Sequence, residues 1–287
     1  MTFEQIRRTT IIALFSDDAL REQLVLKGGN AISLIHKLGS RSSLDLDFSM
    51  ESDFENFDET KERIFRALRD RFDSAGLVVF DESFKPKPEL DGPDERPWWG
   101  GYELRFKVIE RERYDQFKEN HSKRQNAALT IGPGQERVFS VDLSKYEFTD
   151  GKMEVELDDY VIYVYTLEMV IAEKLRAICQ QMPEYSLKGR PKPRARDFYD
   201  IHLVVTKTGI DLTTLENCEL LKSVFSAKQV PLRFLQELPE QREFHRVDWP
   251  AVVASVGEKL EEYDFYFDFV LGLVQMLKPL WIKEPPL

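Results

Sequence analysis

Cysteine and glycine are scarce in this chain of 287 residues, which contains 2 Cys and 14 Gly. Two cysteines, Cys179 and Cys218, cannot form a disulfide framework, and neither stands in a CxxC pair or at zinc spacing from a histidine. The low glycine content excludes a collagen-like repeat, and 42% hydrophobic residues exclude a wholly disordered chain. We therefore expect a globular protein with reduced thiols.

Long apolar runs are also absent. The most apolar stretch near the end, residues 269–277, is far shorter than the roughly 18 residues that span a bilayer. The apolar run near the start is too short for a signal peptide and is followed at once by Asp17 and Asp18. We expect a cytoplasmic protein with no membrane partner. The 51 acidic residues outnumber the 40 Lys and Arg, a net charge of −11, which argues against a wholly basic surface but permits a local basic groove.

The hydrophobic pattern changes character along the chain. Helical spacing covers residues 3–23, and the short β-like run LVLK ends in two glycines. A helix is expected over 30–39, with Asn30 as its cap and Gly39 as its end, and a strand over 43–50. Further helices are expected at 57–75, 166–182, 196–209, near 213–226 and, as one long element, at 250–277; strand patterns occupy 77–165. The predicted fold class is α+β: a mixed sheet flanked by helices in a first domain (1–162), then an all-helical domain (163–287).

Paired acids follow the glycine turn. In SLDLDFSM the apolar residues alternate with Asp45 and Asp47, so on a strand both carboxylates project from the open face. Two close carboxylates repel each other unless a cation lies between them, and Mg²⁺ is held in this way. A solvent-facing polar edge is the alternative for these two residues alone. The preceding Gly28–Gly29 turn and helix start would let a phosphate approach the backbone.

Two charged residues in the helical half are unusual for their positions. Lys174 lies in line with apolar residues on one helix stripe, so it is either a lysine at the rim of the core or one aimed inward at phosphates. Asp197 also falls on an apolar stripe, where a carboxylate needs a partner, unless it caps the helix that it opens. Asp200, one turn later, is expected only to pair with Arg196 or Lys207.

Other charged residues were weighed as parts of a site. Asp142 would bring a third carboxylate to Asp45 and Asp47 if its strand neighbours theirs. Basic side chains cluster in two places, where they either face solvent or contact a polynucleotide backbone: Lys188, Arg190, Lys192, Arg194 and Arg196 in one loop, and Arg105, Lys107, Arg111 and Arg113 on and after a strand. Trp98 and Trp99 offer a stacking surface or simply belong to the core.

Taken together, three ordered motifs resemble one protein family. LKGGNAISLIHKLGSRSSLDLDFSM, EKLRAI and RPKPRARDFYDI are similar to motifs of the AbiEii/AbiGii nucleotidyltransferase toxins, members of the polymerase-beta-like nucleotidyltransferase superfamily. The resemblance covers residues from about 20 to 210. It implies an enzyme that uses Mg²⁺ (or Mn²⁺) to transfer a nucleotide from an NTP to RNA, in some relatives to the 3′ end of tRNA, and that is paired with an antitoxin, often of winged-helix type.

The resemblance also assigns roles by position. Gly28, Gly29 and Asn30 fall on the nucleotide-binding turn, and Asp45 and Asp47 on the metal-binding pair. Lys174 falls on a lysine that contacts the triphosphate, and Asp197 on a second catalytic aspartate. Two residues beside the acidic pair complete the nucleotide-binding candidates, Arg41 and Ser42.

The expected function is therefore a Mg²⁺-dependent nucleotidyltransferase toxin of a toxin–antitoxin or phage-defence (abortive infection) system. Asp45, Asp47, Lys174 and Asp197 are the expected catalytic residues. Two alternatives stay open at this point. Paired carboxylates and a lysine also suit a metal-dependent nuclease or phosphohydrolase, and a non-catalytic module could retain the fold only to bind a partner.

Overall fold

The computed structural model describes residues 2–38, 45–88, 98–131, 136–185, 191–257 and 259–282. The chain divides into two compact units: Met1–Gly28 with Ser43–Val164, and Gly29–Ser42 with Tyr165–Leu287. The predicted domains, 1–162 and 163–287, stay a prediction. No helix in the described ranges is long and apolar enough to cross a membrane.

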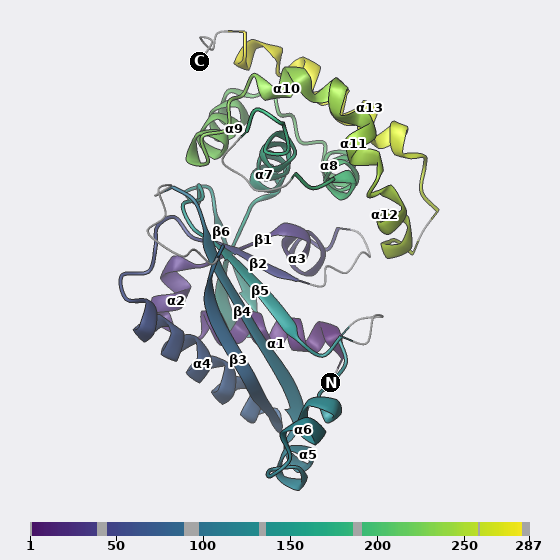
Figure 1. The fold of residues 1–287 in the computed structure, drawn as a ribbon. Coiled ribbons are helices and arrows are strands. Elements are labelled where there is room, and N and C mark those ends of the chain that lie inside the picture. Colours follow the sequence, from purple (N-terminus) through teal and green to yellow (C-terminus); the bar gives the residue numbers. More distant parts are fainter. Residues whose placement is uncertain are drawn as a thin grey trace. The chain divides into compact units, whose positions relative to one another are not determined.

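The first unit contains a mixed sheet, seven-stranded over the described residues, in the order β3-β4-β5-β2-β1-β7-β6 (Figure 1). Parallel pairs join β1 to β7 and β2 to β5, and the other neighbours are antiparallel. The strands are β1 (Val25–Lys27), β2 (Leu46–Ser49), β3 (Leu77–Lys87), β4 (Gly101–Glu110), β5 (Phe139–Ser144), β6 (Met153–Leu157) and β7 (Tyr160–Val164). The predicted α+β class, with a mixed sheet, flanking helices and C-terminal helices, is confirmed.

Helices cover one face of this sheet. They are α1 (Phe3–Phe15), α2 (Asp18–Gln23) and α4 (Phe57–Asp73). The core forms where aromatic rings of helix and strand meet: ring centroids lie 6.0 Å apart for Phe15–Phe48 and 5.9 Å apart for Phe72–Phe106. Side chains of a strand alternate between its two faces. The strand residues next to Phe48 and Phe106 in sequence therefore project from the opposite face, which we call the polar face.

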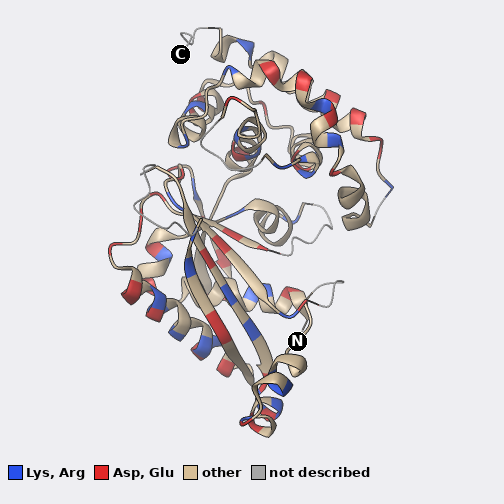
Figure 2. Ribbon diagram, in the orientation of Figure 1, with Lys and Arg blue, Asp and Glu red and all other residues tan. Residues whose placement is uncertain are grey.

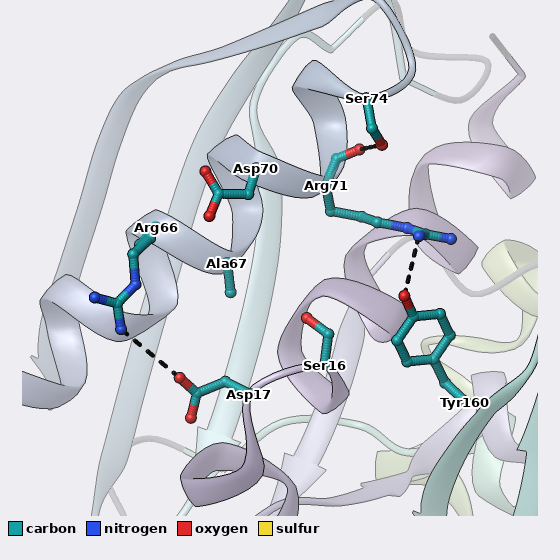
Figure 3. A pocket seen from close by; sticks show the side chains of 8 residues that line it. All are labelled: Ser16, Asp17, Arg66, Ala67, Asp70, Arg71, Ser74 and Tyr160. Atoms are coloured by element: carbon teal, nitrogen blue, oxygen red, sulfur yellow. Dashed lines mark hydrogen bonds and ion pairs between the residues drawn. The ribbon is translucent and has the colours of Figure 1, made fainter.

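Figure 3 shows a hollow on the helix side, about 390 Å³ in volume, between α4, the α1–α2 turn and β7. The Arg66 guanidinium lies 3.9 Å from Asp17, and Arg71 donates to the Tyr160 hydroxyl at 3.3 Å (Figure 3). The two arginines of this hollow therefore have partners within the fold.

Two short helices project from the sheet between β4 and β5: α5 (Arg111–Gln116) and α6 (His121–Ala127). The sequence pattern treated this stretch as part of the sheet region, because its many charged residues hide the helical period. The edge strand β6 was also missed, since most of its residues are exposed and carry little apolar alternation.

The second unit is helical in its described residues. Its elements are α7 (Leu167–Cys179), α8 (Ala195–Thr208), α9 (Leu215–Ala227), α10 (Phe234–Glu237), η2 (Leu238–Gln241), α11 (Arg242–Arg246), α12 (Trp249–Ser255), α13 (Tyr263–Met276) and η3 (Lys278–Leu280). The short α3 (Gly28–Asn30) and the π-helical turn η1 (Ala31–Ile35) follow β1.

Two predicted long helices are wrong. The helix expected over 3–23 breaks because the Asp17 side chain accepts hydrogen bonds from the N–H groups of Ala19 and Leu20 and so starts α2. The helix expected over 250–277 breaks after Ser255, where Val256 is extended, and resumes as α13 at Tyr263.

Candidate active site

Gly28 joins β1 to α3 and contacts one of the predicted metal-binding acids. Its φ of +70° lies in the left-handed region that favours glycine. A β-carbon added here would lie 2.7 Å from Asp47 Oδ2, well inside van der Waals contact. The conformation favours glycine, and a β-carbon would force the Asp47 carboxylate to shift, so the absent side chain lets this carboxylate approach the backbone.

Asp47 lies on β2 between two fully buried neighbours, Leu46 and Phe48, and projects from the polar face. The strand is shorter than predicted, because it begins at Leu46. Asp45 therefore lies in an exposed bend ahead of the strand and not on the strand itself.

Asp142 lies on the strand next to Asp47, as its proposed role required. β5 pairs with β2 in parallel, and the register sets Asp142 opposite Asp47 on the same face. Its carboxylate binds Lys87, whose Nζ lies 2.8 and 3.0 Å from the two Asp142 oxygens and 3.2 Å from Glu103 Oε1. Burial would lower the pKa of Lys87, but Asp142 and Glu103 outweigh it and raise that pKa. The Asp142 carboxylate is thus already paired with the Lys87 ammonium.

The acids fit a divalent cation only in part. Within the described ranges, no three His, Cys, Asp or Glu side chains gather closely enough to hold a metal ion. Asp47 still offers a carboxylate on the polar face, and Mg²⁺ commonly takes only one or two protein carboxylates, its other ligands being water and substrate phosphates. An ion held mainly by Asp47 would therefore depend on water and on the phosphates of a bound nucleotide for its other ligands.

Lys27, which the sequence pattern did not single out, is a buried cation on the same face. It pairs with Asp47 in the β1–β2 register, and its Nζ lies 3.2 Å from Ser144 Oγ and 3.5 Å from Glu147 Oε1. A lysine at the last position of a buried strand, directly before the glycine turn, is a signal that could have identified it.

The remaining turn residues differ from the prediction. The helix begins at Gly28, so Asn30 lies inside it with helical φ and ψ, is fully buried and makes no cap hydrogen bond; its predicted role as a cap is wrong. Gly29 is the second residue of α3. Arg41 and Ser42 lie outside the described residues.

Lys174 lies on the buried face of α7 and is only 5% exposed. Its Nζ lies 2.8 Å from Asp197 Oδ1 and 2.7 Å from Asp200 Oδ2, both on α8. Burial would lower the pKa of Lys174, but the two carboxylates raise it, so the ammonium stays charged. Lys174 can therefore lie in an apolar stripe because two buried carboxylates bind its ammonium group.

Asp197 is a buried ion-pair partner and not a helix cap. α8 begins at Ala195 after Arg194, and the second Asp197 oxygen accepts from Arg194 Nε at 2.5 Å. Burial would raise the pKa of Asp197, but Arg194 and Lys174 hold it well below its usual range. Asp200 was expected to pair with nothing beyond Arg196 or Lys207, and this limit is wrong: it also binds Lys174 and is 1% exposed. Its spacing of three residues from Asp197, which places both on one helix face, was the signal.

His245, on α11, completes this buried cluster. The Arg194 backbone N–H donates to His245 Nδ1 at 3.0 Å, and the ring is fully buried against Phe198. Burial lowers the pKa of His245 to about 4, so the ring is neutral near pH 7. In the basic loop, Arg194 is thus committed to the cluster, whereas Lys188 and Arg190 lie outside the described residues.

The comparisons with known proteins decide the family. Residues 11–269 match the family described as "Nucleotidyl transferase AbiEii toxin, Type IV TA system". The chain belongs to this family. The AbiEii assignment confirms the predicted resemblance and the enzyme class: the chain is a nucleotidyltransferase toxin, and a type IV toxin–antitoxin system implies an antitoxin partner.

No curated protein matches the sequence. Among solved structures, a Helicobacter pylori protein assigned as a nucleotidyltransferase is 17% identical with a TM-score of 0.47, over 99% of this chain and 97% of that one. JHP933 from the same organism is 17% identical with a TM-score of 0.45, over 98% and 90%. A nucleotidyltransferase-like antigenic protein from Paracoccidioides brasiliensis is 12% identical with a TM-score of 0.36, over 83% and 91%.

Proposed function

We propose that this AbiEii toxin transfers a nucleoside monophosphate from an NTP to an RNA acceptor, the 3′ end of tRNA, in a Mg²⁺-dependent reaction. The observation that carries the proposal is the fit between Gly28 and Asp47, with Asp142 opposite on the adjacent strand. A glycine with positive φ, placed where a side chain would displace a projecting carboxylate, favours a site where phosphate and cation approach the backbone together.

In this reaction the acceptor hydroxyl oxygen forms a bond to the α-phosphorus. The bond between that phosphorus and the bridging oxygen breaks, pyrophosphate leaves, and the hydroxyl proton passes to solvent. Asp47 and Asp45 would hold the Mg²⁺, with Asp142 as the candidate third ligand. When bound, Mg²⁺ would neutralise charge that develops on the phosphates.

The helical unit's role in the proposal follows from its ion pairs. Lys174 is the candidate contact for the triphosphate. Asp197 is better suited to orient Lys174 than to accept a proton, because both its oxygens are engaged and its lowered pKa makes it a weak base near neutral pH. Asp200 shares the orienting role, since it binds the same ammonium.

The family context completes the proposal. Transfer to tRNA would halt translation and serve toxin–antitoxin control or abortive infection in the cytoplasm. The antitoxin is proposed to be of winged-helix type, as the resemblance implies.

The test uses labelled NTPs, each in turn, with Mg²⁺ and total RNA that includes tRNA. The parent protein is compared with Asp47→Asn and with Asp18→Asn, whose side chain is largely exposed on α2. We expect labelled tRNA with the parent and the Asp18→Asn variant, and at least about a 10²-fold loss with Asp47→Asn at unchanged stability. Degraded RNA without label would favour a nuclease, and no NTP binding would favour a binding module.

A further inference from the structure

The polar face of the sheet continues well beyond Asp47 and Asp142. The β4–β5 register sets Glu103 opposite Asp142, and Arg105 follows two residues later on the same face of β4. The Arg105 side chain is exposed. The face that carries the candidate catalytic acids therefore becomes basic along β4.

The far end of this face is covered by the α5–α6 hairpin. The cluster of Phe80, Ile109 and Ala128, against which Tyr114 and Ala127 pack, holds the hairpin in place. Ile109 lies on β4 an even number of residues from Arg105, so the hairpin packs on the face that carries the candidate acids.

A polar anchor fixes the same hairpin. Asp81 accepts hydrogen bonds from His121 Nε2 at 2.8 Å and from Gln125 Nε2 and Lys107 Nζ at 2.9 Å. Burial would raise the pKa of Asp81, but these partners lower it to about 2. Two α6 side chains are therefore tied to Asp81 of β3, which also binds Lys107 of β4, and this anchors the hairpin on the sheet.

The hairpin has a hollow of about 480 Å³ with no carboxylate in its lining, which consists of Arg113, Gln116, Phe117, Lys123, Asn126 and Ala127. Residues 111–127 carry five Lys and Arg against three Asp and Glu, in a chain of net charge −11 (Figure 2). Cationic and carboxamide side chains are the groups that donate to phosphate oxygens, and a half-buried phenyl ring can stack on a base.

We propose that this surface, from Arg105 to the α5–α6 hollow, binds the sugar–phosphate backbone of the RNA acceptor. The inference rests on the proposed function, since it names how the same substrate is held. From Glu103 to Glu110, β4 covers roughly 24 Å at about 3.4 Å per residue, which is long enough for several nucleotides. With the reacting 3′ end at the candidate acids, the cations at the far end would contact phosphates further toward the 5′ side of the strand.

The test removes two cations from the hollow in the full chain, with Arg113→Ala and Lys123→Ala combined. Arg113 has one ion pair, to exposed Glu110 at 3.3 Å, so its loss should leave the fold intact. The control combines Lys61→Ala and Arg66→Ala on α4, which changes the net charge equally on the opposite side of the sheet. Binding of fluorescent tRNA is measured across salt concentrations, and KM is measured separately for RNA and NTP.

We expect the hollow variant to raise the Kd and KM for RNA about tenfold or more, with KM for NTP unchanged. The slope of log K against log salt should fall by about 1.4, since each lost contact to single-stranded phosphate removes about 0.7. Equal Kd in hollow and control variants, or equal losses for RNA and NTP, would overturn the proposal. If the parent binds RNA but does not label it, the result counts against the transfer reaction and not against the proposed RNA-binding surface. If the parent does not bind RNA, the proposed surface is wrong.

Discussion

Gly28→Ala should damage the site in a way that the same change at another glycine does not. Gly28 and Gly76 have nearly equal φ values, +70° and +72°, so alanine costs about 1–2 kcal/mol of backbone strain at either position. At Gly76 an added β-carbon meets nothing within 4 Å, whereas at Gly28 it meets Asp47 Oδ2 at 2.7 Å. Gly76→Ala is therefore a control that separates backbone strain from the contact with Asp47.

The magnitude follows from that contact. Ordinary van der Waals contact begins at 3.4 Å, so the Asp47 oxygen must retreat by about 0.7 Å. Misplacement of a reacting group by an ångström can cost about 10²-fold in rate, and we expect a 10- to 100-fold loss of nucleotide transfer for Gly28→Ala. Local overpacking adds about 1–3 kcal/mol of destabilisation beyond the control.

The assay measures initial rates of labelled nucleotide incorporation together with thermal unfolding for the parent and both variants. Gly76→Ala should lose stability and keep its rate once folded. A Gly28→Ala variant whose rate and stability match those of Gly76→Ala would refute the reasoning, because Asp47 could then move without consequence.

Two further predictions concern the buried cluster. Lys174→Met should cost about 3–5 kcal/mol in denaturant unfolding, because two buried carboxylates lose their shared ammonium. Combined with Asp200→Asn, the loss in free energy of unfolding should be about 0.5–3 kcal/mol smaller than the sum of the losses of the two single variants. Strict additivity would contradict the ion-pair assignment. For His245, the unfolded ring takes up a proton near pH 6.5 and the folded ring only near pH 4, so stability should fall by about 3 kcal/mol as pH drops through that window. Urea unfolding of the parent and His245→Asn tests this, and equal pH dependence in both would argue against it.

The pattern of the sequence predicted what local rules control. Alternation around Asp47 predicted the burial of Leu46 and Phe48, although Ser49, expected on the open face, is also buried. The apolar stripes of α7 and α8 marked Lys174 and Asp197 as charges unusual for their positions, and Asp197 as a carboxylate that needs a partner. The pattern could not say that Lys174 and Asp197 would bind each other, because that depends on how two helices pack. Asp200 was misjudged for the same reason: its partner lies on another helix, and only its spacing from Asp197 hinted at it.

Breaks and additions escaped prediction for a different reason. The interruption at Asp17 depends on one side chain, which accepts hydrogen bonds from two backbone N–H groups and so starts a new helix. The spacing of the hydrophobic residues carries no information about such a cap. The α5–α6 hairpin rests on a small satellite cluster around Phe80 and Ile109, outside the main core. A few apolar contacts are enough to hold so short an element on the sheet. The rest of its sequence is polar, and such a sequence is also typical of a loop.

The buried cluster also limits how Lys174 can serve an NTP. An ammonium has three donors, and Asp197 and Asp200 take two of them. Lys174, Arg194, Asp197 and Asp200 are two cations and two carboxylates, so the charges of these four side chains offset one another. A phosphate would therefore gain one directed hydrogen bond from Lys174 and little attraction from the cluster as a whole. Under the proposed function, neutralisation of the triphosphate would then come mainly from the divalent cation, and Lys174 would orient the phosphates more than it attracts them.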